Sequence, residues 1–300
     1  MKKIGRYFSL VKFSHTVFAL PFAMIGFTVA LVYQQRAFPG GPVFSWDLLV
    51  KVLLCMVFAR NAAMAFNRWL DRRFDALNPR TARREIPAGI ISPRHALLFT
   101  VINCLLFVVT TWFINPACFY LSFVALFVIL FYSYTKRFTA LCHLVLGVGL
   151  ALAPLGAYLA VTGSFMRPDT GTFNFIPLLF SLAVFTWVAG FDIIYALQDE
   201  EFDRSNQLHS IPAALGVGRA LMVSNLLHVC TAVFVIAAGL LLSAGWLYWG
   251  GALIFILLLV YQHTLVKPGD LSRVTMAFAN TNGVASITFA VFTILSLILQ

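Results

Sequence analysis

Long apolar runs constrain this chain more than any other feature. Nine stretches of about 20 predominantly apolar residues follow one another through its 300 residues, and a helix needs about 20 such residues to cross a bilayer core about 30 Å thick. Apolar residues make up 61% of the chain and charged residues only 11%, which excludes a water-soluble domain. We therefore predict an all-α membrane protein with nine transmembrane helices, at residues 14–33, 46–66, 94–114, 116–135, 140–162, 174–197, 218–242, 246–266 and 276–299.

The distribution of basic residues predicts the orientation of these helices. If the N terminus is cytoplasmic, the inner segments hold seventeen Lys and Arg residues, whereas the outer segments hold only Arg36 and Arg167. Such a bias is typical of cytoplasmic loops, so we predict a multi-pass protein of the cell inner (plasma) membrane. The net charge of +10 then reflects topology, and we expect the lipid bilayer as partner but neither nucleic acid nor another protein.

Two long inner loops, residues 67–93 and 198–217, carry related acidic motifs. Corresponding positions lie 128 residues apart (199 minus 71, for example), and both segments continue to an Ile-Pro-Ala sequence. This offset predicts an internal repeat of about four helices within a single domain, residues 1–300. Membrane proteins often place their site where such repeats meet. The motif residues are Asn67, Asp71 and Asp75 in the first loop, and Tyr195, Asp199 and Asp203 in the second.

The spacing of the acidic residues predicts a binding site for a cation. Side chains four residues apart share one face of a helix, and like charges at that spacing repel. One such pair alone is usually a solvated helix end. Two copies in equal register at membrane-helix ends instead favour a shared cation. Hard oxygen ligands without His or Cys are typical of Mg²⁺, which commonly also binds phosphate oxygens, so we predict a site for Mg²⁺ and a diphosphate.

Both motifs extend into longer patterns. The first continues from Asn78 through Arg80, Arg83 and Arg84 to Gly89, the second is the Tyr195 to Asp203 segment, and Lys136-Arg137 follows the fourth span. With these patterns the chain resembles the UbiA superfamily of intramembrane prenyltransferases over nearly its full length. The resemblance implies a helical bundle around a central cavity. It also implies that Mg²⁺ on the Asp motifs binds the diphosphate of a polyprenyl donor, whose chain lies in a lateral tunnel open to lipid.

The resemblance also implies roles for individual residues. Oxygen ligands for the metal would come from Asn67, Asp71, Asp75, Asp199 and Asp203. The expected catalytic residues are Asp71, Asp199, Arg84, Lys136 and Tyr195, of which the two basic residues would contact diphosphate oxygens. The expected substrate-binding residues are Asn67, Arg72, Arg60, Asp192 and Arg137.

Arg60 and Asp192 are ionisable residues inside predicted spans. They precede Asn67 and Asp199 by seven residues each, so they lie at equal depth, two turns below the motifs. Charged residues at membrane depth usually face a cavity or one another. One interpretation is an Arg60–Asp192 ion pair between the second and sixth spans, and the other is a role in holding or deprotonating an aromatic acceptor.

The implied reaction is a prenyl transfer in quinone biosynthesis. Loss of diphosphate gives an allylic cation, an aromatic acid of the 4-hydroxybenzoate type attacks it, and loss of a ring proton restores aromaticity. The 4-hydroxybenzoate branch often has Asp where this chain has Arg68 and Pro where it has Glu85. These departures leave a menaquinone-pathway 1,4-dihydroxy-6-naphthoate prenyltransferase as the alternative to the ubiquinone-type enzyme. A secondary transporter is a further alternative, although its charges would be expected nearer the membrane midplane.

Overall fold

The structure is a computed structural model that describes residues 7, 9–11, 19–40 and 44–300. Within these residues it contains helices and isolated bridges but no strand. Eight helical segments of this described part are long and apolar enough to cross a membrane, one fewer than the nine predicted, and α2 (Leu20–Ala37) is not among them. The predicted all-α membrane fold is thereby confirmed. The first predicted span corresponds to α2, but its residues 14–18 lie outside the described part of the chain. The long helices are α2 (Leu20–Ala37), α3 (Trp46–Leu70), α5 (Pro93–Trp112), α6 (Pro116–Thr135), α7 (Cys142–Thr162), α8 (Phe175–Ala196), α11 (Val217–Leu241), α12 (Trp246–Leu265) and α13 (Asn282–Ile298). A π-helical turn, η3 (Met276–Thr281), directly precedes α13.

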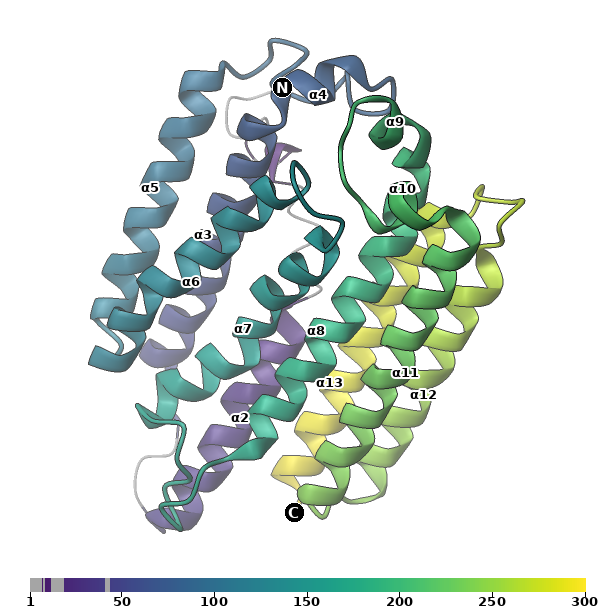
Figure 1. Ribbon diagram of the computed structural model, residues 1–300. Coiled ribbons are helices and arrows are strands. Elements are labelled where there is room, and N and C mark those ends of the chain that lie inside the picture. The colour runs from purple at the N-terminus through teal and green to yellow at the C-terminus, as the bar shows by residue number, and fades with distance from the viewer. Residues whose placement is uncertain (1–6, 8, 12–18, 41–43) are drawn as a thin grey trace.

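The long helices form two four-helix sets of the same order. In the first set α3 packs on α5, α5 on α6 and α6 on α7; in the second α8 packs on α11, α11 on α12 and α12 on α13. The sets meet where α7 lies against α8, and α2 packs on both α7 and α13 (Figure 1). This arrangement matches the four-helix repeat expected from the 128-residue offset, with α3 and α8 as equivalent helices.

Short helices gather at one end of the bundle, at the top of Figure 1. They are α4 (Arg72–Leu77), the 3₁₀ turn η2 (Leu197–Asp199), α9 (Glu200–Ser205) and α10 (Ile211–Leu215). Both acidic loops therefore lie at the same end. The first motif is not one continuous helix, because α3 ends at Leu70 and α4 starts after Asp71. The amides of Asp71 and Asp75 still bond the carbonyls four residues earlier, at 2.9 and 2.8 Å, so the motif keeps its common face.

The opposite end of the bundle carries exposed aromatic side chains. Trp46 starts α3, Trp112 ends α5 and Trp246 starts α12, and these side chains are 63–80% exposed. Tryptophan is enriched at membrane–water interfaces because its ring is apolar and its N–H is polar. These residues accordingly mark the membrane boundary opposite the acidic loops.

Candidate active site

A cavity of about 290 Å³ lies where the ends of the two helix sets meet. Its walls come from α3, α4, α6, α7, α8 and α9 and from the loop after α4. The cavity brings together predicted site residues from both copies of the repeat. Those that line it are Arg60, Asn67, Asp71, Asp75, Arg84, Lys136, Asp192, Tyr195, Asp199 and Asp203.

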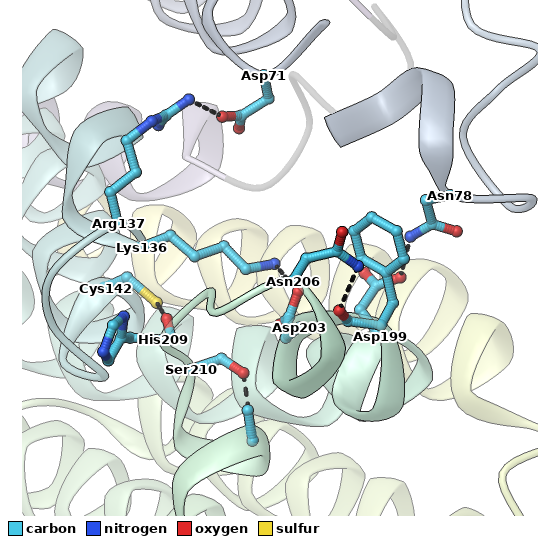
Figure 2. Close-up of polar contacts among 12 residues, drawn as sticks. Asp71, Asn78, Lys136, Arg137, Cys142, Asp199, Asp203, Asn206, His209 and Ser210 are labelled. Carbon is cyan, nitrogen blue, oxygen red and sulfur yellow. Dashed lines mark hydrogen bonds and ion pairs between the residues drawn. The ribbon is translucent and has the colours of Figure 1, made fainter. Parts of the chain in front are cut away.

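Each of the four motif aspartates is paired with a basic side chain. Figure 2 shows Arg137 and Lys136 reaching from the end of α6 toward Asp71 and Asp203. The distances are 2.7 Å from Arg137 Nη2 to Asp71 Oδ1, 2.7 Å from Lys136 Nζ to Asp203 Oδ1, and 2.8 Å from Arg84 Nη1 to Asp75 Oδ1. Asp199 is paired with Arg80. The mutual repulsion of the carboxylates is thus offset by the protein's own cations.

Asp199 joins the second loop to the first. Arg80 Nε donates to Asp199 Oδ1 at 2.9 Å, and Nη2 donates to Oδ2. Asn78 Nδ2 donates to the same Oδ1 at 3.0 Å (Figure 2), and Arg80 Nη1 donates to the Tyr195 hydroxyl at 2.8 Å. Asn78 and Arg80 were not among the predicted site residues, although both stand in the Asn78–Gly89 part of the first motif.

Burial and neighbouring charges shift the pKa values of the groups at the cavity mouth in opposite directions. Burial raises the pKa of Asp71 above its ordinary value, although the Arg137 guanidinium lowers it. Burial alone lowers the pKa of Lys136, but the Asp203 and Asp199 carboxylates nearby act in the other direction, and the pKa is raised overall. Lys136 is therefore a permanent cation here.

The donor atoms at the mouth fit a hard cation that arrives with phosphate. Asp75 Oδ2 is buried and has no hydrogen-bond partner among the described residues. Asn67 donates through Nδ2 to Asp71 Oδ2 at 3.1 Å, which leaves its carbonyl oxygen for other contacts. In the described part of the chain no three His, Cys, Asp or Glu side chains converge as a ready-made metal cage. Mg²⁺ suits such a place, because it is commonly bound by one or two carboxylates together with phosphates and water.

The deep part of the cavity corrects one prediction. Asp192 Oδ2 lies 2.7 Å from His143 Nδ1, and no Arg60–Asp192 ion pair is formed among the described residues. Arg60 Nε is buried without a hydrogen-bond partner in that same part of the chain. The predicted ion pair is therefore wrong: His143 on α7, which was not among the predicted site residues, contacts Asp192 instead. Both charged residues still line the cavity, as the other interpretation requires.

Two further basic residues were predicted to bind substrate. Arg137 does not line the cavity itself, but it forms an ion pair with Asp71, which does. Arg72 is not brought to the cavity: its Nη1 donates to the Trp69 carbonyl at 2.7 Å, and its guanidinium lies over the Trp69 ring at 5.0 Å.

A second, apolar cavity of about 400 Å³ adjoins the first. Its walls come mainly from α3, α5, α6 and α7, and along α6 they extend from Cys118 to Tyr132, which is about 21 Å at 1.5 Å per residue. The two cavities share wall residues and are therefore adjacent spaces. The shared residues are Arg60, Met64, Tyr132, Leu146 and Leu150.

Known proteins resemble this chain over most of its length. Residues 19–284 match the UbiA prenyltransferase family. The 4-hydroxybenzoate octaprenyltransferase of Tolumonas auensis is 31% identical over 252 residues, which are 84% of either chain, and that of Aeromonas salmonicida is 31% identical over 253 residues, 83% of either chain.

Solved structures have the same fold. A UbiA homolog from Aeropyrum pernix K1 superposes with a TM-score of 0.80 at 31% identity, over 94% of this chain and 97% of that one. A UbiA homolog from Archaeoglobus fulgidus bound to DMAPP and Mg²⁺ superposes with a TM-score of 0.71 over 98% of this chain and 100% of that one. Its identity is 21%, so this second likeness concerns the fold alone.

Proposed function

Since this chain belongs to the UbiA prenyltransferase family, we propose that it transfers a polyprenyl group from a polyprenyl diphosphate to an aromatic acid of the 4-hydroxybenzoate type. One structural observation gives the proposal its main support. A cavity lined by paired Asp and basic residues adjoins an apolar cavity long enough for a hydrocarbon chain. A diphosphate with an apolar tail has this same division into a polar and an apolar part. The reaction would supply a prenylated ring for quinone biosynthesis.

The basic residues at the cavity mouth would bind the diphosphate. Mg²⁺, held by Asn67, Asp71, Asp75, Asp199 and Asp203, would stabilise the charge on the leaving group. Arg80, Arg84, Lys136 and Arg137 each bond an aspartate in this structure. If Mg²⁺ were bound by those carboxylates, the four basic side chains would be available to offset the negative charge of the diphosphate oxygens.

The apolar cavity would hold the prenyl chain. The allylic C–O bond breaks between the two cavities, its electron pair leaves with the diphosphate, and the carbon becomes cationic. Tyr195 and Phe278 line the polar cavity with ring centroids 4.3 Å apart, and aromatic faces stabilise cations. The two loops would cover this point and exclude water, which would otherwise capture the cation.

Arg60 and Asp192 would bind the acceptor. Arg60 forms no ion pair with any described residue, yet it lies deep in the cavity wall. A buried unpaired guanidinium favours an anionic ligand, and its planar donors match a carboxylate. The acceptor's ring carbon attacks the prenyl cation, and Asp192 would take up the ring proton that is then released. This assignment favours an aromatic acid over a neutral acceptor.

The residues that depart from the 4-hydroxybenzoate branch are partners of each other. Arg68 Nη1 is bonded to Glu85 Oε2, and Arg68 is 4% exposed. The two departures thus form one structural unit and need not reflect a different acceptor. Relatives that are 31% identical to this chain are 4-hydroxybenzoate octaprenyltransferases, which favours 4-hydroxybenzoate; 1,4-dihydroxy-6-naphthoate, which is also an aromatic acid, remains the alternative.

The charges would orient the protein in the inner membrane with its acidic loops in the cytoplasm. Basic residues predominate in the segments at that end, whereas the exposed tryptophans lie at the other end. The motif carboxylates lie at helix ends rather than at mid-helix, which favours the enzyme over a secondary transporter.

Purified protein with Mg²⁺, a polyprenyl diphosphate and equal amounts of 4-hydroxybenzoate and 1,4-dihydroxy-6-naphthoate tests the proposal. We expect diphosphate release and a lipid-soluble product whose mass identifies prenylated 4-hydroxybenzoate. Asp71→Asn and Asp199→Asn should each lower turnover at least about 100-fold, because an essential charge-stabilising group is lost. Full turnover in either variant would refute the metal assignment, and the absence of any prenylated acid with wild-type protein would refute the function.

A further inference from the structure

His143 is a buried histidine that neither acidic motif contains. It is the second residue of α7, it is 3% exposed, and it lines the polar cavity beside Asp192. Both ring nitrogens have partners. Nδ1 lies 2.7 Å from Asp192 Oδ2, and Nε2 accepts from the backbone N–H of Ile211 at 3.4 Å.

The second contact determines where the ring proton lies. A backbone N–H can only donate, so in the neutral ring His143 Nε2 presents its lone pair and the proton is on Nδ1. Nδ1–H therefore donates to Asp192 Oδ2. Asp192 Oδ1 makes no hydrogen bond to any described residue, and the Asp192 side chain is 23% exposed in the cavity wall. One carboxylate oxygen is thus held while the other remains available.

Ile211 starts α10, and the segment just before it is anchored near α7. The backbone N–H of His209 donates to the Lys136 carbonyl at 2.7 Å, and the Cys142 thiol contacts the His209 carbonyl at 3.6 Å, as Figure 2 shows. Ser210 then caps α10 by accepting from the Ala213 amide at 3.3 Å. The loop that carries Asp203 is therefore tied to the α6–α7 connection immediately beside His143.

From this geometry we infer that His143 is a positioning residue for the acceptor half of the reaction. It fixes the orientation of Asp192 so that Oδ1 faces the acceptor, and its own tautomer is set by the loop that carries Asp203. Since the role of Asp192 is part of the proposed function, the inference rests on that function. A fixed hydrogen bond to a carboxylate restricts its rotation, and removal of such an orienting contact commonly lowers activity about 10–100-fold.

Two substitutions separate the two ring contacts of His143. In His143→Asn the amide nitrogen occupies the place of Nδ1 and can still donate to Asp192. In His143→Gln the amide oxygen occupies the place of Nε2 and can still accept from Ile211, but the donor to Asp192 is displaced. His143→Leu removes both contacts.

The readout is steady-state kinetics with the acceptor and donor varied separately. We expect His143→Asn to stay within about threefold of wild type, and His143→Gln and His143→Leu to lose about 10–100-fold in kcat/KM for the acceptor. KM for the polyprenyl diphosphate should be unchanged in all three, which also shows that the variants fold. An active Gln variant beside an impaired Asn variant would overturn the inference, because it would mean that His143 only anchors the loop.

Asp192→Asn distinguishes failure of the inference from failure of the function. If wild type prenylates the acid and Asp192→Asn does so at full rate, the role of His143 is wrong and the proposed reaction stands. If wild type prenylates no aromatic acid, the proposed function fails and the inference fails with it. Loss of acceptor turnover in Asp192→Asn with donor KM unchanged is the result that supports both.

Discussion

Arg80 and Asp199 lie 119 residues apart and form a two-point ion pair that joins the two acidic loops. The same guanidinium also donates to Tyr195, so one side chain contacts two residues of the candidate site. Under the proposed function Asp199 is a metal ligand and Arg80 becomes available to the diphosphate. The pair therefore joins the loops in this structure, and we expect it to be exchanged when the donor binds.

Arg80→Ala should weaken donor binding and destabilise the protein. We expect KM for the polyprenyl diphosphate to rise about tenfold, which corresponds to about 1.4 kcal/mol. The variant should also lose roughly 1 kcal/mol of stability, because Asp199 keeps Asn78 as a partner and the Arg80 side chain is 29% exposed. Kinetics and thermal unfolding in detergent measure both effects. Arg94→Ala, at an exposed position, is the control and should change neither.

Arg137→Gln should shift the acid side of the pH–activity profile to higher pH. Burial raises the pKa of Asp71 and Arg137 lowers it, so removing the guanidinium raises that pKa further. Metal binding needs the carboxylate form; a higher pKa therefore means that activity is lost earlier as pH falls. Arg72→Gln is the matched control, because Arg72 contacts Trp69 instead of Asp71. An identical profile in Arg137→Gln and wild type would contradict the electrostatic role of Arg137.

The acidic half of the site was predictable because its signal is repeated. Asp71 and Asp199 stand in equal register at the ends of equivalent helices, so two weak patterns support one another. The fold followed from the apolar runs for a similar reason, since lipid requires every backbone polar group to be satisfied within the helices.

The deep half of the site was not predictable from spacing. The equal depth of Arg60 and Asp192 indicated an ion pair, but depth does not determine which neighbouring helix each side chain faces. α8 packs closely on α7, so Asp192 meets His143. A lone His inside an apolar run carries no sequence signal of its partner. Arg80 shows the same limit: its partner lies in the other copy of the repeat.

Gly26→Ala should destabilise the contact between α2 and α7. A Cβ at Gly26 would lie 2.2 Å from the Pro154 carbonyl oxygen, which is backbone and cannot rotate away. We expect a loss of about 1–3 kcal/mol, as for other overpacked core positions, seen as a lower unfolding temperature in detergent. Gly218→Ala provides the comparison, because a Cβ there meets nothing within 4 Å. Equal unfolding temperatures for the two variants would mean that α2 and α7 can move apart at Gly26 without a loss of stability.

Gly156→Leu should shorten the prenyl chain that the enzyme accepts. Gly156 lines the apolar cavity on α7, and a Cβ there would meet no atom within 4 Å, so we expect a leucine side chain to extend into the cavity space. Under the proposed function that space holds the prenyl chain of the donor. We therefore expect kcat/KM for long polyprenyl diphosphates to fall about tenfold or more. For dimethylallyl and geranyl diphosphate, kcat/KM should remain near the wild-type value. Gly218 also has open space around it but lies outside both cavities, so Gly218→Leu should leave the ratio of kcat/KM for long and short donors unchanged. Equal losses for short and long donors in Gly156→Leu would place the prenyl chain elsewhere.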